Sequence, residues 1–122
     1  MRRHRGQRGR GYRARMLEPA LLLLMQHGPA HGYTLLNQIE EFGFRNIDPS
    51  LVYRAMRQME VQGLVTSAWD DTETQGPPRR VYHLTSSGND VLDKYIGELK
   101  GTRGMIDRIL DAYNKHTSGS KG

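Results

Sequence analysis

The sequence predicts a mostly α-helical α+β fold, in which three helices are followed by a two-stranded β-hairpin and a long terminal helix. Three observations predict it. Apolar residues recur at helical spacing between helix-breaking residues, two short strand-like runs flank a polar loop, and an apolar stripe repeats every seven residues near the C-terminus. The 122 residues are enough for one compact domain and its core.

The first two helices lie on either side of Gly28-Pro29, which ends the first of them. Pro19 suits a first helical position, so the apolar run 21–25 is expected to form a buried helix after it. A second helix is expected to begin near residues 31–32 and to end at Gly43. Its apolar positions at helical spacing are Leu35, Leu36, Ile39 and Phe42.

A third helix begins at Asp48-Pro49, where a carboxylate at the N-cap precedes proline at the first helical position. It is expected to run to about Gln62. Counting at helical spacing places Val52, Met56 and Met59 on one face, and Ser50, Arg54, Arg57 and Val61 on the other. One face therefore packs on a core, and the opposite face presents two guanidinium groups.

The β-hairpin consists of a strand from Leu64 to Asp70, a polar loop over 71–78, and a strand from Arg79 to Thr85. Side chains alternate between the two faces of a strand. Arg80 therefore shares a face with Tyr82 and Leu84, and Arg79 lies on the opposite face.

Thr85 is expected to cap a final helix from about Ser86 to Tyr113. Its apolar positions span about 140° of arc, more than a small core needs, so we expect them to form the seam of a homodimer. They are Leu92, Tyr95, Ile96, Leu99, Ile106, Ile109, Leu110 and Tyr113. Glycines at 97, 101 and 104 lie nearly opposite and mark either a weakened solvent face or a second close contact.

Charge divides the chain unevenly. Residues 1–15 hold seven arginines and no acidic residue, whereas the rest holds 11 basic and 13 acidic residues. We expect a basic Arg/Gly-rich tail without regular structure over 1–15, a DNA-binding domain over 16–85, a dimerisation helix over 86–115 and a flexible tail over 116–122. The basic tail either serves as a solvated extension or contacts phosphate.

Several functional classes are excluded. The chain has no cysteine, which rules out disulfides and thiolate metal sites. Its longest apolar run is six residues, against the ~20 of a membrane span, so we expect a cytoplasmic protein with no membrane partner. His27 and His31 are four residues apart, but Gly28-Pro29 breaks the helix that would align them on a metal. No nucleophile with a base or phosphate-cradling loop appears, so we expect no enzyme activity and no cofactor.

The second and third helices match a helix-turn-helix, and the hairpin that follows makes it a winged helix. A helix fits the DNA major groove, where arginine bonds the guanine O6 and N7 atoms. An unrelated small α+β module fits the same pattern, with Arg54 and Arg57 as solvated charges on an exposed helix face. Interpreted as a winged helix, the pattern predicts double-stranded DNA as the partner, with Arg54 and Arg57 reading bases and Ser50 donating to a phosphate. One of Arg79 and Arg80 is expected to reach the neighbouring backbone or minor groove.

Over residues 17–88 the chain resembles the PadR family of transcriptional regulators. Its opening helix precedes His31-Gly32-Tyr33, which is similar to an H-G-Y signature of the family, and residues 50–65 resemble the recognition helix. Ser67-Ala-Trp69 is similar to the first wing strand, and 79–88 resembles the R-x-Y-x-L-T-x-x-G strand. Apolar residues Val52, Met56 and Met59 replace the more usual leucines, a change that cores tolerate. The single terminal helix resembles the compact subgroup.

This resemblance implies a homodimeric regulator, usually a repressor, that binds a pseudo-palindromic operator and is released by a small effector. It adds Tyr33 and Tyr53 as phosphate contacts, with packing as the alternative role of each. The full set of candidate DNA-binding residues is then Tyr33, Ser50, Tyr53, Arg54, Arg57, Arg79 and Arg80. A pocket for a small hydrophobic effector is expected near Trp69 and Tyr95, although Trp69 also suits packing within the wing.

Two other functions remain open. The Arg/Gly tail suits a protein that coats nucleic acid, RNA included, without sequence preference. A near-neutral winged helix also suits an adaptor that binds protein, because the fold alone does not decide function.

Overall fold

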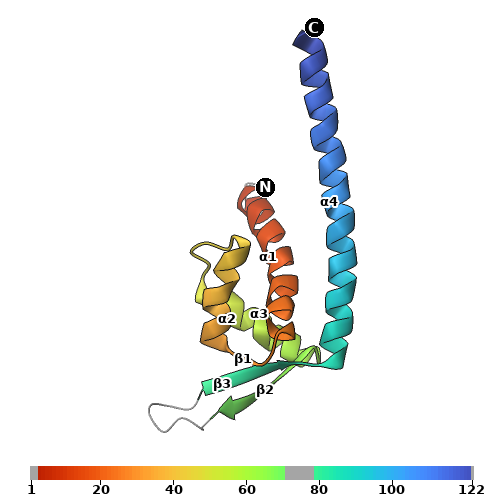
Figure 1. Ribbon diagram of the computed structural model, residues 1–122. Coiled ribbons are helices and arrows are strands. Elements are labelled where there is room, and N and C mark those ends of the chain that lie inside the picture. Colours follow the sequence, from red (N-terminus) through yellow and green to blue (C-terminus); the bar gives the residue numbers. More distant parts are fainter. Residues whose placement is uncertain (1–2, 71–78, 122) are drawn as a thin grey trace. The chain divides into compact units, whose positions relative to one another are not determined.

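A computed structural model describes the backbone of residues 3–70 and 79–121 and the side chains of residues 15–70 and 79–117. The helices are α1 (Arg3–Gln26), α2 (Gly32–Gln38), the short 3-10 helix η1 (Ile39–Phe42), α3 (Pro49–Val61) and α4 (Ser86–Lys121). The strands are β1 (Ala30–His31), β2 (Val65–Asp70) and β3 (Arg79–Leu84) (Figure 1). The predicted α+β winged helix-turn-helix is confirmed.

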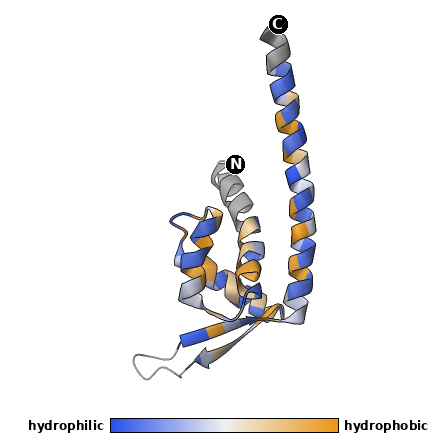
Figure 2. Ribbon diagram, viewed as in Figure 1, coloured by the Kyte–Doolittle hydropathy of each residue, from blue (hydrophilic) through white to orange (hydrophobic). Residues whose placement is uncertain are grey.

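The chain forms two compact units, the winged-helix unit (Met1–Leu92) and the terminal-helix unit (Asp93–Gly122). The core of the first lies where α1, α2 and α3 meet, and Figure 2 shows hydrophobic residues gathered there. Val52, Met56 and Met59 of α3 are fully buried, as is Leu21 of α1, so the predicted inner face of α3 is confirmed. Each such side chain contributes roughly 1.5–3 kcal/mol by leaving water.

The sheet has three antiparallel strands in the order β1-β3-β2, whereas the sequence predicted two. The predicted hairpin is correct, with Val65 opposite Leu84 and Trp69 opposite Arg80. The added strand β1 places Ala30 opposite Tyr82. It has two residues, too few to show the alternation by which a strand is recognised in sequence.

One helix start ties the end of α3, the wing and α4 together. The Thr85 hydroxyl accepts the Gly88 backbone N–H at 2.9 Å, which confirms Thr85 as the cap of α4. Its own hydrogen is shared between the carbonyl oxygens of Gly63 at 2.7 Å and Leu64 at 2.9 Å. A Cβ at Gly88 would overlap the Leu64 carbonyl oxygen, so this helix turn packs there because the residue is glycine. We call Leu64, Thr85 and Gly88 the Thr85 joint.

The structure corrects three predicted boundaries. Helix α1 begins at Arg3, within the segment expected to lack regular structure, and Pro19 is buried inside α1 rather than at its start. Extending an existing helix costs far less than starting one, so this segment continues α1 although it holds Gly6, Gly9 and Gly11. Helix α4 continues to Lys121, beyond the expected flexible tail at 116, because no proline interrupts it.

Leu92 is also corrected as a seam residue. Its side chain is 1% exposed and belongs to the winged-helix unit, so a partner chain has no access to it. The seven-residue spacing assigned Leu92 to the stripe because that spacing is the same along the whole of α4. It does not show that the first turns of α4 belong to the winged-helix unit. Across residues 3–70 and 79–121, no helix combines the length and the apolar character that crossing a membrane requires.

Gly88→Ala tests the Thr85 joint. We expect a loss of folding stability of more than about 2 kcal/mol, because the new methyl group meets a backbone carbonyl oxygen that cannot move aside. Chemical denaturation monitored by circular dichroism measures it. Gly101→Ala is the control, because a Cβ there meets nothing within 4 Å and alanine favours a helix by about 1 kcal/mol over glycine. If Gly88→Ala and Gly101→Ala change the folding stability equally, the close packing of Gly88 on Leu64 is not needed for stability and the Thr85 joint is refuted.

Candidate nucleic-acid interface

Helix α3 begins as predicted. The Asp48 carboxylate accepts the Ser50 backbone N–H at 3.0 Å, and Pro49 occupies the first position. That backbone hydrogen bond lowers the pKa of Asp48 below its ordinary value, with smaller contributions from the Ser50 hydroxyl and the Arg54 charge. Both polar groups of Ser50 therefore face Asp48, and a phosphate at this position would compete with a carboxylate for them.

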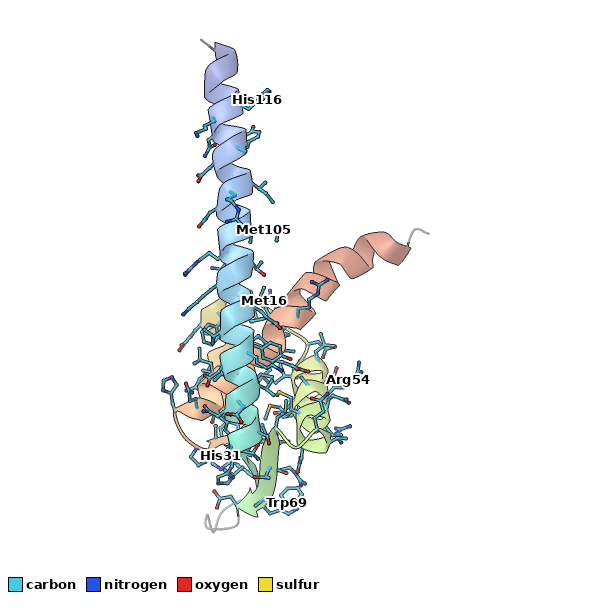
Figure 3. All side chains as sticks on the ribbon, turned by 90° about the vertical axis from the view of Figure 1, so that its right-hand side faces the viewer. Met16, His31, Arg54, Trp69, Met105 and His116 are labelled. Carbon is cyan, nitrogen blue, oxygen red and sulfur yellow. The ribbon has the colours of Figure 1, made fainter. Side chains whose placement is uncertain are left out.

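The outward face of α3 is the one that helical spacing predicted. Ser50, Arg54, Arg57 and Val61 are all exposed, and Figure 3 shows Arg54 on the outer side of the helix. Val61 is 79% exposed, so this face stays uncovered by the part of the chain that the structure describes. The geometry leaves two guanidinium groups, one helical turn apart, available to an external partner.

One flank of α3 packs on the sheet through Tyr53 and Glu60. A Cβ at Gly32 would lie 2.7 Å from Tyr53 Cε1 and 3.6 Å from Tyr82 Cε2, so both rings come close to α2 because residue 32 has no side chain. Tyr53 is half-buried there. This contact explains the glycine of His31-Gly32-Tyr33, and it gives Tyr53 the packing role that the sequence left open.

The face of the wing that meets α3 is here called the inner wing face. Its members are Val65, Ser67, Trp69, Arg80, Tyr82 and Leu84, which pair across β2 and β3. Arg80 Nε donates to Ser67 Oγ at 2.9 Å, and Ser67 Oγ donates to Glu60 Oε2 at 2.7 Å. The Arg80 guanidinium also lies 4.7 Å from the centre of the Trp69 ring. Burial raises the pKa of Tyr82, and the nearby Glu60 carboxylate adds to this rise.

The opposite side, the outer wing face, carries a second cluster. His31 Nε2 lies 3.1 Å from Asp70 Oδ2, so β1 is linked to the far strand β2 across β3. The His31 ring stacks on Tyr33, with 5.2 Å between centroids. Arg79 donates to the Tyr33 hydroxyl at 2.8 Å and lies 4.8 Å above its ring. Tyr33 therefore positions Arg79, and His31 contacts a carboxylate rather than His27.

The predicted residues fall into two groups. Arg54, Arg57 and Arg80 lie on α3 and the inner wing face, whereas Tyr33 and Arg79 lie on the outer wing face. The sequence separated the two wing arginines correctly. It missed Glu60 and Ser67, although strand alternation placed Ser67 on the face of Arg80.

The remaining predicted residues lie on β2 and α4. Trp69 is 66% exposed at the end of β2, and Tyr95 is half-buried on α4. Ile96 and Leu99 are half-buried as well. The later stripe is exposed, at 41% for Ile106, 63% for Ile109, 54% for Leu110 and 67% for Tyr113. Among the side chains at 15–70 and 79–117, no three histidine or acidic residues gather around a point that suits a metal.

Known proteins share this architecture. Residues 21–94, more than half of the chain, match the model of the transcriptional regulator PadR-like family. A PadR-like transcription factor from Bacteroides fragilis is similar over 84% of this chain and 98% of its own, with 24% identity and a TM-score of 0.70. No curated protein gives a significant match.

Two further solved structures show the same likeness. A PadR family transcription regulator from Clostridium difficile is 21% identical over 77% of this chain and 97% of its own, with a TM-score of 0.69. A PadR family transcriptional regulator from Eggerthella lenta is 28% identical over 74% of this chain and 80% of its own, with a TM-score of 0.61.

Asp48→Ala is expected to lower the thermal midpoint of unfolding at neutral pH, because α3 loses its cap. The pKa of Asp48 in the folded protein lies below its ordinary value of 3.8. The stabilisation is therefore fully present above that value and is lost as the pH falls through the lower folded pKa. Thermal melts from neutral to acidic pH measure the difference between the midpoints of the unchanged protein and the Asp48→Ala variant. We expect this difference to become smaller on acidification. Asp48→Asn is the control, since asparagine also caps helices but does not ionise in this range. A difference that is independent of pH would contradict the assignment.

Proposed function

The chain belongs to the PadR-like family of transcriptional regulators, and we propose that it acts as a homodimeric repressor that binds a pseudo-palindromic DNA operator. Regulators of this family bind DNA and are not enzymes, in agreement with the sequence prediction. The observation that carries the proposal is the arrangement of α3. Its inner face is buried in the core, and its outer face holds Arg54 and Arg57 in solvent.

In this proposal α3 enters the major groove. Arg54 and Arg57 lie close to the same face, so both can reach base edges from one position of the helix. The hydrogen bonds of Ser67 to Glu60 and Arg80 link the wing to α3, which supports a wing that lies beside the same stretch of DNA. Tyr33 and Arg79 are then proposed to contact the phosphate backbone. Ser50, held by Asp48, and Tyr53, packed beside Gly32, are proposed to keep α3 in position for that contact.

The exposed part of the α4 stripe supports a dimer. Ile106, Ile109, Leu110 and Tyr113 leave a large apolar surface in water, and such a patch marks a surface that another molecule covers. A second copy of the helix would cover it with an identical patch. The half-buried residues Tyr95, Ile96 and Leu99 continue the same seam. A dimer presents two α3 helices, which suits a two-fold operator.

Relief of repression by a small hydrophobic effector is the remaining part of the proposal. Tyr95 is the residue we assign to that site, because it is half-buried within the seam. Binding there would alter the pairing of the two α4 helices and hence the spacing of the two α3 helices. Trp69, the other residue predicted for this site, lies on the wing at the end of β2.

Arg54→Ala together with Arg57→Ala is expected to abolish sequence preference. Each base-reading arginine contributes roughly 1–3 kcal/mol of discrimination. Purified protein is incubated at physiological salt with fragments of its own genome, and the retained fragments are sequenced. The unchanged protein should enrich a few fragments that share a two-fold motif, and the double variant should not.

The matched control removes the same charge from α4, at Lys100 and Arg108, both exposed and away from the stripe. This control should enrich the same fragments as the unchanged protein. If the Arg54/Arg57 variant also enriches them, the reading role of α3 is wrong. If a folded protein retains no DNA at all, an adaptor function is favoured.

Deletion of residues 1–15 distinguishes the repressor proposal from the alternative, in which the basic tail binds nucleic acid without sequence preference. This alternative predicts that the deletion removes binding and most of its dependence on salt. The repressor proposal instead predicts weaker binding with the same sequence preference. Uniform retention of all fragments by the intact protein would also favour the alternative.

Leu110→Lys is expected to shift the protein towards monomer, because a charge would be buried in the seam. Ala112→Lys is the control, since Ala112 is exposed on another side of α4. Sedimentation velocity at micromolar concentration measures both. An intact protein that is monomeric under these conditions, or equal behaviour of the two variants, would contradict the seam.

A further inference from the structure

We propose that Trp69 is a DNA contact, whose indole packs against the sugar–phosphate backbone beside the groove entered by α3. This inference rests on the proposed DNA-binding function. It adds a backbone contact by Trp69 to the base contacts proposed for Arg54 and Arg57. Trp69 is the single tryptophan of the chain. It stands at the end of β2 (Figure 3).

Nothing among the side chains of residues 15–70 and 79–117 explains the exposure of Trp69. The side chain is 66% exposed, although tryptophan is among the residues that gain most from burial. Among the described residues, none accepts a hydrogen bond from its indole N–H. An apolar ring and a donor are therefore both available, and phosphate oxygens are acceptors that such donors reach on DNA.

The ring is nevertheless held in place. The Arg80 guanidinium lies 4.7 Å from the ring centre, and Arg80 is in turn fixed by its hydrogen bond to Ser67. Ser67 donates to Glu60, so a continuous chain of contacts runs from α3 to the indole. Fixing the side chain in advance lowers the entropy that binding costs. One face of the indole is covered by Arg80, and the rest of the ring is presented outward.

The position of the ring fits the DNA-binding side of the fold. Along the inner wing face, Val65 is buried in the core, Ser67 contacts α3, and Trp69 extends one step further. Arg57 follows Tyr53 by four residues on α3, so it lies beside the flank that packs on the sheet through Tyr53 and Glu60. The Arg80 guanidinium adjoins Trp69, and positive charge of this kind attracts a phosphate backbone.

A backbone contact positions the protein but carries no sequence information. Loss of the indole should therefore weaken binding to operator and to unrelated duplex by the same factor. Arg80 acts as a positioning residue, because its planar guanidinium covers one face of the ring. Arg80→Lys keeps the charge but loses the planar stacking surface. It should therefore remove part of the DNA affinity that the Trp69 indole contributes.

Tryptophan fluorescence of the unaltered protein tests the proposal without a substitution, since all of it comes from Trp69. Binding of the operator duplex, selected as above, is followed by the anisotropy of a label on the DNA. We expect the Trp69 emission to change over the same titration and its quenching by acrylamide to fall severalfold. Operator binding with unchanged emission and unchanged acrylamide quenching would overturn the proposal. The absence of an anisotropy change would overturn the proposed function itself.

Variants provide the second measurement. Trp69→Ala should weaken binding to operator and to unrelated duplex about 10-fold, as expected for a truncated tryptophan at a contact. Met105→Ala, which truncates an exposed residue of α4, should leave both affinities unchanged. Arg80→Lys combined with Trp69→Ala should weaken binding by less than the product of the two single effects. A loss confined to the operator would instead show base reading, and unchanged affinity would refute the contact.

Discussion

The hydroxyl of Thr85 holds together three parts of the winged-helix unit that the chain builds separately. It caps α4 through the Gly88 N–H and donates to the carbonyl oxygens that follow α3. The end of α3, the base of the wing and the start of α4 are therefore fixed at one point. A side chain at Gly88 would separate them, because the Leu64 carbonyl occupies the space. The direction of α3 relative to the wing, and hence the surface offered to DNA, depends on this joint.

The two faces of the wing use the same chemistry for different purposes. On each face an arginine covers an aromatic ring, Arg80 over Trp69 and Arg79 over Tyr33. The outer pair connects the wing to α2, whereas the inner pair continues the surface of α3 through Ser67 and Glu60. The proposed assignment follows from this difference. We propose that α3 reads bases, that the inner wing face holds the backbone, and that α4 joins two copies.

Sequence predicted those features that depend on local spacing. The capped start of α3 and its two faces follow from Asp48-Pro49 and from helical periodicity, and the separation of the wing arginines follows from strand alternation. It failed where tertiary contacts decide. The two-residue strand β1 exists because β3 pairs with it, and Leu92 is buried although its spacing fits the seam. The contacts of Glu60 and Ser67 join residues of different elements, which no periodicity connects.

Protection of guanine N7 from dimethyl sulfate reports on whether α3 enters the major groove, because this atom faces that groove. We expect two groups of protected guanines in the operator, related by a dyad and spaced by about one helical turn, ~10 base pairs, or a multiple of it. The Arg54/Arg57 double variant should lose this protection. An operator that is bound without protection of any guanine N7, or with a single unpaired group, would contradict a dimer that reads DNA through α3.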